Sequence, residues 1–297
     1  MKSGTSPLQG RTVVVTGAAR GLGRALAERL AGCGARLALV GRNTDALGEV
    51  AASLPAEAEC WEADVTDHAA LADVSRHIRE RFGPPSVVIA NAGVAEGGPF
   101  LHSDPVTWRR VIDVNLVGSA NTARAFLPDL LASRGYFLQI ASLASMGTSP
   151  MMSAYCASKA GVEAFAHSLR AEVAHEGVGV GIAYLNWMDT DMTQDSEQFA
   201  VLRELRAHEP APARKVFPAS EVADRMVRTI ERRRGAVYVP GWLRSVQAVR
   251  GALPLVVLAV ARRELPRIAQ ESPITATGLL GAGARDGERP GPSLREV

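Results

Sequence analysis

Lysine is nearly absent from this chain of 297 residues. Of its 33 basic residues only three are lysines, at positions 2, 159 and 215. Aromatic residues make up only 5% of the sequence, and its three cysteines form no Cys-x-x-Cys pair. An odd, scattered set of cysteines excludes a disulfide framework and is typical of reduced thiols. Arginine is therefore the usual cation here, and a lysine in a patterned position stands out.

A strong charge of either sign is also missing. The 31 acidic residues leave a formal net charge of +2, which is too small to favour nucleic-acid binding. The histidines, including His102, His167 and His175, have no metal-ligand spacing with acids or cysteines, so we expect no metal site. The N-terminus MKSGTSPLQG lacks the apolar segment of a signal peptide, and we expect a cytoplasmic protein.

Long apolar runs are absent except for LPLVVLAVA, residues 253–261, which arginines flank at 244, 250, 262, 263 and 267. Nine apolar residues are too few to span a bilayer. Two interpretations stay open for this segment: a helix packed on the domain or on a partner subunit, or a peripheral contact with a membrane surface. Residues 271–297 are rich in glycine and proline, and we expect them to be disordered.

Short apolar runs alternate with longer amphipathic ones, a pattern that predicts βαβ units and a parallel sheet. We expect one doubly wound Rossmann-type α/β domain over 9–240 and a C-terminal helical extension over 241–270. The segment 193–218 is predicted to be a lid or substrate loop. The seven expected strands cover 12–16, 36–40, 59–63, 87–90, 136–141, 178–185 and 236–239. The expected helices cover 22–32, 44–53, 67–82, 105–132, 153–175 and 219–233.

A glycine-rich turn follows the first expected strand. In TGAARGLG, Gly17, Gly21 and Gly23 stand between that strand and the next helix. Glycines there let the backbone approach a pyrophosphate at the helix N-terminus, where unpaired N–H groups favour negative charge. The spacing G-x-x-x-G-x-G differs from the G-x-G-x-x-G of many dinucleotide-binding proteins.

A hydroxyl, a phenol and an ammonium form the second motif. Tyr155 and Lys159 are one helical turn apart and project from the same face, while Ser142 lies thirteen residues before the tyrosine, at the end of an expected strand. A free tyrosine has a pKa of about 10, and a nearby ammonium makes it a better acid near neutrality. This trio can protonate and polarise a carbonyl group.

Together these motifs resemble the short-chain dehydrogenase/reductase family over residues 9–240. The resemblance implies a catalytic tetrad of Asn115, Ser142, Tyr155 and Lys159, in which Ser142 polarises the substrate oxygen, Tyr155 exchanges its proton and Lys159 activates Tyr155. Asn115, in VIDVNLVG, would hold a water that links Lys159 to bulk solvent. Asn91 would brace the sheet, and the Gly93 backbone would lie along the cofactor.

The resemblance also implies a nicotinamide cofactor. Members that use NAD(H) place an acid at the end of the second strand, where this chain has Gly41, followed by Arg42. With Arg20 inside the glycine turn, two guanidiniums could face a 2′-phosphate, which favours NADP(H). The expected cofactor contacts are Gly17, Arg20, Gly21, Leu22, Gly23, Arg42, Asp64, Val65, Asn91, Ala92, Gly93, Tyr155, Lys159, Met188 and Thr190.

One stretch departs from the family pattern. In YLNWMDTDM, Leu185 and Asn186 replace a Pro-Gly pair, whereas Thr190 matches the threonine that would contact the carboxamide of the nicotinamide. We therefore expect the substrate side of the site to differ more than the cofactor side. Apolar residues expected around the pocket indicate a lipophilic substrate: Leu143, Met151, Met152, Trp187 and Met188.

The predicted function is NADP(H)-dependent hydride transfer between nicotinamide and a carbonyl or secondary alcohol, in a homo-oligomer, either dimer or tetramer. Two alternatives remain: a β-ketoacyl-thioester reductase of lipid or polyketide synthesis, and a cofactor-binding scaffold protein that uses its C-terminal segment. Expected partners are a small-molecule substrate and, through that segment, a membrane surface, but no nucleic acid.

Overall fold

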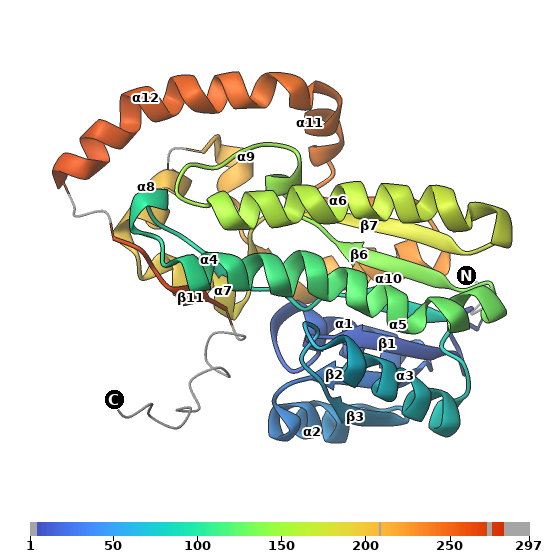
Figure 1. Cartoon of the computed structure of the whole chain (residues 1–297). Coiled ribbons are helices and arrows are strands. Elements are labelled where there is room, and N and C mark those ends of the chain that lie inside the picture. The colour runs from blue at the N-terminus through green and yellow to red at the C-terminus, as the bar shows by residue number, and fades with distance from the viewer. Residues whose placement is uncertain (1–4, 208, 272–274, 282–297) are drawn as a thin grey trace, which may run out of the picture.

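Seven parallel strands form the central sheet of the computed structural model, which describes residues 5–207, 209–271 and 275–281 (Figure 1). The strand order is β10-β7-β6-β4-β1-β2-β3, with the crossover at β1 and β4 that a doubly wound sheet requires. Each of these strands lies where the sequence predicted one. They are β1 (Thr12–Thr16), β2 (Arg36–Gly41), β3 (Ala58–Glu62), β4 (Val87–Ala90), β6 (Tyr136–Ile140), β7 (Gly179–Leu185) and β10 (Ala236–Val239).

Helices cover both faces of the sheet (Figure 1). Side chains alternate along each strand, so Val14 packs into one core while Val13 and Val15 pack into the other. The first core lies under α3 (His68–Phe82), α5 (Gly118–Ser133) and α6 (Ser153–Val173). The second lies under α1 (Gly21–Gly32), α2 (Thr44–Ser53) and α10 (Ala219–Glu231). The strands are therefore apolar on both faces, as buried parallel strands are.

The helix predicted over 105–132 is interrupted. It consists of α4 (Pro105–Ile112), a π-helical turn (Asp113–Val117) and α5. Asp104 caps the start of α4, because its carboxylate accepts a hydrogen bond from Thr107 N at 2.9 Å. The π turn contains Asn115, and such turns are frequent at functional sites.

The segment 193–218, predicted to be a loop, is mostly helical. It contains α7 (Asp191–Glu197), α8 (Ala200–Ala207) and α9 (Ala211–Arg214), and a short parallel pair joins β8 (Met188–Asp189) to β9 (Phe217–Pro218). These elements gather beyond the carboxyl ends of the strands (Figure 1). The prediction of a loop was wrong because the stretch breaks into helices of only 7, 8 and 4 residues, which are too short to be told from loops by their sequence pattern.

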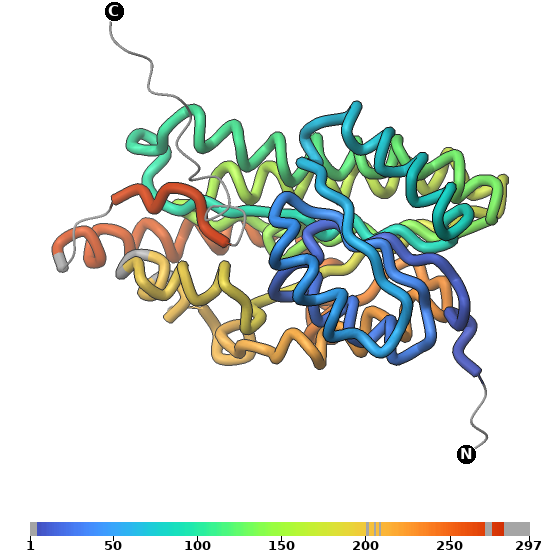
Figure 2. Tube along the Cα trace, turned by 90° about the horizontal axis from the view of Figure 1, so that it is seen from below, coloured from blue at the N-terminus to red at the C-terminus, as the bar shows by residue number. Residues whose placement is uncertain are grey.

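The C-terminal extension is longer and more ordered than predicted. After α11 (Leu243–Val249) comes α12 (Leu253–Glu271), and β11 (Leu279–Leu280) pairs antiparallel with β5 (Ala95–Glu96). Disorder was the wrong prediction for residues 275–281, which lie beside the N-terminal half of the chain through the pairing of β11 with β5 (Figure 2). Residues 272–274 and 282–297 lie outside the described part of the chain. The remaining short 3-10 turns are Phe100–His102, Leu143–Ser145, Ala174–Glu176 and Arg250–Ala252.

Candidate active site

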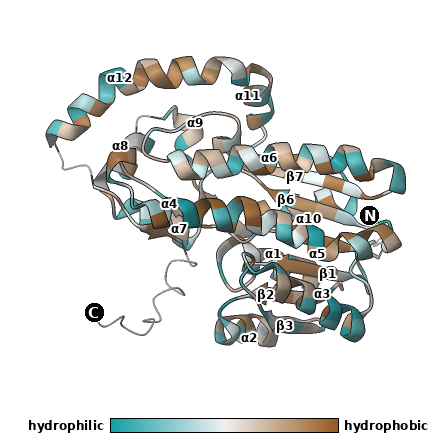
Figure 3. Cartoon of the chain, viewed as in Figure 1, coloured by the Kyte–Doolittle hydropathy of each residue, from teal (hydrophilic) through white to brown (hydrophobic). Residues whose placement is uncertain are grey.

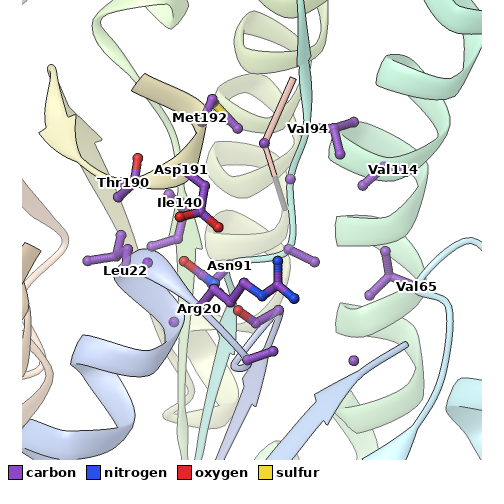
Figure 4. A pocket seen from close by; sticks show the side chains of 18 of the residues that line it. Arg20, Leu22, Val65, Asn91, Val94, Val114, Ile140, Thr190, Asp191 and Met192 are labelled. Carbon is purple, nitrogen blue, oxygen red and sulfur yellow. The ribbon is translucent and has the colours of Figure 1, made fainter. Parts of the chain in front are cut away.

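A cleft opens at the carboxyl ends of the strands, and all fifteen residues of the predicted cofactor set border it (Figure 4). Ser142 borders it too, whereas Asn115 is buried, 1% exposed. Residues separated by more than 170 positions in the chain thus meet at one edge of the sheet. The position agrees with the rule that ligands of doubly wound sheets bind beyond the strand ends, where the strand order reverses.

The glycine turn has the geometry that its sequence predicted. Gly17 and Gly21 have φ angles of +65° and +52°, a region that residues with a side chain rarely adopt. A Cβ atom on Gly23 would lie 2.1 Å from the Gly17 carbonyl oxygen. Helix α1 begins there without a side-chain cap and without an acid in its first turn. Its first N–H groups therefore suit a pyrophosphate.

Asn91 braces the sheet beside this turn, as expected. Its side-chain amide donates hydrogen bonds to the carbonyls of Thr16, at 2.9 Å, and Gly17, at 3.2 Å. The Thr16 hydroxyl in turn accepts bonds from the backbone N–H groups of Asn91 and Ala92. The ends of β1 and β4 are thereby locked together, which fixes the floor of the cleft.

Positive charge surrounds the end of β2. Arg20, Arg42 and Arg110 all border the cleft near Gly41 and Asp64. The Asp64 carboxylate accepts a short hydrogen bond from Arg110 and lies 3.9 Å from the Arg42 guanidinium. Although burial raises the pKa of Asp64, hydrogen bonds from Thr66 and Arg110 hold it below its ordinary value. The Asp64 carboxylate thus lies between two guanidiniums, those of Arg42 and Arg110.

Arg110 was not predicted from the sequence. It stands on α4, and its partner Asp64 is 46 residues away, so no local pattern links them. The cleft also includes Asn43, Asp191, Met192 and Gly281. Gly281 could not have been found, because it enters the cleft only through the pairing of β11 with β5.

Tyr155 lies on the first turns of α6, half-buried at the end of β6. Burial raises the pKa of Tyr155 to about 12, and a hydrogen bond with Ser142 opposes that rise. Ser142 also caps the turn after β6 by accepting a bond from Ala144 N at 3.2 Å. The structure therefore brings the phenol and the serine hydroxyl together, with the proton held on the phenol at neutral pH.

Lys159 lies one turn further along α6, on the same side. Its ammonium nitrogen is 5.6 Å from the centre of the Tyr155 ring and donates a hydrogen bond to the Ile140 carbonyl at 3.3 Å. The residue is only 5% exposed, and burial lowers the pKa of Lys159 to about 8. Near pH 7 its charge is kept, but it is lost in a mildly alkaline range.

Asn115 supports this trio from behind. Its side chain exchanges two hydrogen bonds of 2.9 Å with the backbone of Val94 and donates a third to Ser158 on α6. A Cβ atom on Gly93 would lie 3.2 Å from the Asn115 oxygen and 3.7 Å from the Lys159 ammonium. Asn115 thus ties α6 to the segment after β4. Its role in holding a water stays a prediction.

The departure from the Pro-Gly pattern has a structural counterpart. Leu185 ends β7 and pairs with Val239, and Asn186 N donates to the Val239 carbonyl. The Asn186 side chain donates a 2.6 Å bond to the carbonyl of Ala213, so it anchors the α7–α9 segment. Thr190 lies against the glycine turn, where a Cβ on Gly21 would be 3.3 Å from its methyl group. Figure 4 shows Thr190 on the opposite side of the cleft from Val65.

An apolar cluster packs against Tyr155. Of the residues predicted around the pocket, Met151 and Met152 belong to it, whereas Trp187 instead donates a hydrogen bond to Glu209. The buried members come from four distant elements, and α12 contributes one of them. They are Ala95, Leu202, Ile268 and Leu280, with Met192 and Phe199 partly buried beside them. The C-terminal extension thus contributes to the apolar cluster against which Tyr155 packs.

No group of three or more histidine, cysteine, aspartate or glutamate residues within 5–207, 209–271 and 275–281 is arranged to hold a metal ion. The cleft itself presents hydroxyl, phenol, ammonium, guanidinium and carboxylate groups.

Comparison with known proteins agrees with this geometry. The model of the short chain dehydrogenase family matches residues 11–200. The chain belongs to the short-chain dehydrogenase family. It is 33% identical over 204 residues to an uncharacterized oxidoreductase of Staphylococcus epidermidis, and the aligned region covers 68% of this chain and 88% of that protein. It is 31% identical over 222 residues to the 3-oxoacyl-[acyl-carrier-protein] reductase FabG of Escherichia coli, where the aligned region covers 73% of this chain and 88% of the relative.

A solved short-chain dehydrogenase of Burkholderia phymatum has the same fold. That structure, a complex with NAD, superposes with a TM-score of 0.73 at 28% identity and covers 81% of this chain and 92% of its own. The protein is thus an oxidoreductase of the short-chain dehydrogenase family with a nicotinamide dinucleotide site.

Proposed function

We propose that this short-chain dehydrogenase is an NADP(H)-dependent reductase of a lipophilic carbonyl compound. The observation that carries the cofactor preference is the pair of guanidiniums, of Arg42 and Arg110, beside Asp64, where an NAD-type site would present an acid at position 41. Arg20 borders the same cleft. Two guanidiniums beside one carboxylate leave an excess of one positive charge at the end of β2. A 2′-phosphate carries the complementary charge and accepts several charge-assisted hydrogen bonds.

When bound, the dinucleotide supplies or accepts the hydride. The glycine turn and the start of α1 would hold its pyrophosphate, and Thr190 and the Met188 backbone would contact the carboxamide. Tyr155 donates a proton to the substrate oxygen, Ser142 polarises that oxygen, and Lys159 provides the positive charge that favours the phenolate left behind. A phenol whose pKa is about 12 keeps its proton at neutral pH, so Tyr155 is in the protonated form that reduction of a carbonyl requires.

The apolar cluster beside Tyr155 supports a lipophilic substrate. Met192 borders the cleft and packs with Met151, Met152 and Phe199 in this cluster, so the cleft meets thioether and aromatic side chains there, which suits an alkyl chain better than a polar ligand. A β-ketoacyl thioester is a second candidate, because the relative from E. coli is named as a reductase of such compounds. Location in the cytoplasm and assembly as a dimer or tetramer stay predictions from the sequence.

Fluorescence titration of the purified chain with NADPH and NADH tests the cofactor, and oxidation of the bound cofactor by a panel of long-chain ketones and aldehydes tests the chemistry. We expect NADPH to bind at least about tenfold more tightly and to be consumed. Faster turnover of acyl-carrier-bound ketones than of free ones would favour the thioester reductase. Tight binding without turnover on either panel would favour the scaffold protein, and NADH preference would contradict the assignment to the arginines.

A further inference from the structure

Helix α12 is apolar on both of its sides over its first half. Its inner side packs on the protein: Leu253 lies against Gly147, and Ile268 is 4% exposed in the cluster beside Tyr155. Its outer side carries four exposed aliphatic residues. They are Leu255, 71% exposed, Val256, 56%, Leu258, 47%, and Val260, 46%. A helix that is apolar all round is normally covered on every side, and nothing in the described chain covers the outer side of this one.

Hydropathy colouring shows this band on α12 at the outer edge of the molecule (Figure 3). The segment Leu243–Gln270 has 28 residues and a mean hydropathy of 1.5 in its most apolar window, only 6% of which is buried. By length and composition it could cross a membrane. The view that this region is too short to span counted only the unbroken run of nine apolar residues, and the structure corrects it.

The contacts of the extension favour a helix that lies flat. Arg250 donates hydrogen bonds to Glu163 at 2.7 Å and to the Ser145 carbonyl at 2.9 Å, which fixes the start of α12 to the catalytic domain. Ile268 fixes its other end. A spanning orientation would break both attachments and uncover the side of Tyr155, whereas an interfacial orientation keeps them.

The charge around the apolar band fits anionic lipid. Between Leu243 and Gln270 there are five arginines and one acid, Glu264. Arg244 precedes the band, and Arg262 and Arg263 follow it on exposed positions. Cationic residues at the edges of an interfacial helix bind phospholipid headgroups while the apolar residues between them enter the acyl boundary.

A second copy of the chain is a poorer partner for this face. A two-fold contact through the middle of α12 would place the arginines at one end of the helix opposite the arginines at the other end of its copy. Like charges facing each other across an interface oppose association.

We propose that the outer side of α12 docks flat on an anionic phospholipid bilayer while its inner side stays on the protein. Ile268, on the inner side, belongs to the apolar cluster against which Tyr155 packs, so the proposed membrane contact lies on a helix that is one cluster away from the proposed substrate site. A lipophilic substrate could then pass from the bilayer along α12. This second point rests on the proposed function, but membrane binding does not.

Vesicle flotation with the full-length protein tests the docking. We expect binding to vesicles containing about a third phosphatidylglycerol, weak binding to pure phosphatidylcholine, and release by alkaline carbonate. The double variant Leu255→Glu/Val256→Glu should bind at least about tenfold less, because each glutamate removes apolar area and adds a repelled charge. The matched control Val106→Glu, at an exposed valine on α4, should bind like the wild type.

Three results would overturn the proposal. Flotation that the double variant leaves unchanged would place the contact elsewhere, and retention after carbonate would indicate a spanning helix. Failure to bind vesicles, together with a drop in oligomeric state in the double variant, would make this face an interface between copies. Consumption of NADPH with a water-soluble carbonyl, measured without vesicles, should be equal in the wild type and the double variant. If the double variant lost this activity but still showed the expected loss of vesicle binding, the result would count against the proposed function and not against docking.

Discussion

The ammonium of Lys159 lies 5.6 Å from the centre of the Tyr155 ring and donates its hydrogen bond to a main-chain carbonyl, that of Ile140. The buried ammonium thus places a positive charge near the phenol, but burying that charge lowers the stability of the folded protein. Burial places its pKa near 8, below its unfolded value, so removing its charge should stabilise the protein and remove its activity.

The variant Lys159→Met should be more stable than the wild type at pH 7, with a free energy of unfolding about 1–3 kcal/mol higher in urea titrations. The folded pKa of about 8 is lower than the unfolded value of about 10.4, so the wild type gains stability as pH rises between these values. The advantage of the variant should therefore shrink by pH 10. Lys215→Met, at an exposed lysine, is the control and should show neither effect. A variant less stable than the wild type at pH 7 would contradict the assigned burial cost.

The variant Arg42→Ala should bind NADPH at least about tenfold more weakly, while its affinity for NADH changes by no more than about twofold. The reason is that the guanidinium would contact only the 2′-phosphate, which NADH lacks. Titration by cofactor fluorescence measures both constants. The control Arg24→Ala removes an exposed arginine of α1 that pairs with Glu28 outside the cleft. An equal loss of affinity for both cofactors would show that Arg42 does not contact the 2′-phosphate.

Gly23→Ala should abolish tight cofactor binding. The new methyl group would lie 2.1 Å from the Gly17 carbonyl oxygen, so the turn must move away from the pyrophosphate position. We expect a loss of about a hundredfold in affinity with either dinucleotide and a lower melting temperature. Gly32→Ala, at the other end of the same helix, meets nothing within 4 Å and should leave affinity unchanged. Normal binding by the Gly23 variant would mean that the turn does not hold the pyrophosphate.

Arg250→Met should destabilise the protein by about 1–2 kcal/mol, because Glu163 is 4% exposed and would lose its cation. Tyr184 and Gln247 still donate hydrogen bonds to the same carboxylate oxygen, which limits the loss. Thermal unfolding of this variant and of Arg244→Met, an exposed neighbour, measures the difference. If both substitutions lowered the stability equally, the ion pair between Arg250 and Glu163 would contribute no more than an exposed arginine does.

The parts of the structure that local pattern determines could be predicted from the sequence. The seven strands, the glycine turn and the one-turn spacing of Tyr155 and Lys159 follow from periodicity and chain geometry. The family pattern also led to Asn91, whose amide bonds the carbonyl of Thr16, and to Thr190, which borders the cleft beside Gly21. Their roles toward a cofactor stay predictions.

The features that sequence reasoning missed depend on long-range contacts or on backbone detail. Arg110 on α4 reaches the cleft by its hydrogen bond to Asp64 after β3, and Ile268 on α12 joins the apolar cluster against which Tyr155 packs. The π turn that contains Asn115 leaves the helical periodicity of the sequence unchanged, so it could not be predicted from the sequence. The pairing of β11 with β5 joins segments about 180 residues apart, so its two short strands carry no local sign of each other.

The most direct test of the account is NADPH oxidation by Tyr155→Phe beside the wild type, with a long-chain ketone that the wild type reduces. The account predicts that turnover falls by about a thousandfold or more while NADPH affinity stays within about twofold, because the variant lacks only the proton that Tyr155 donates. Turnover within about tenfold of the wild type would show that another group protonates the substrate and would contradict the mechanism.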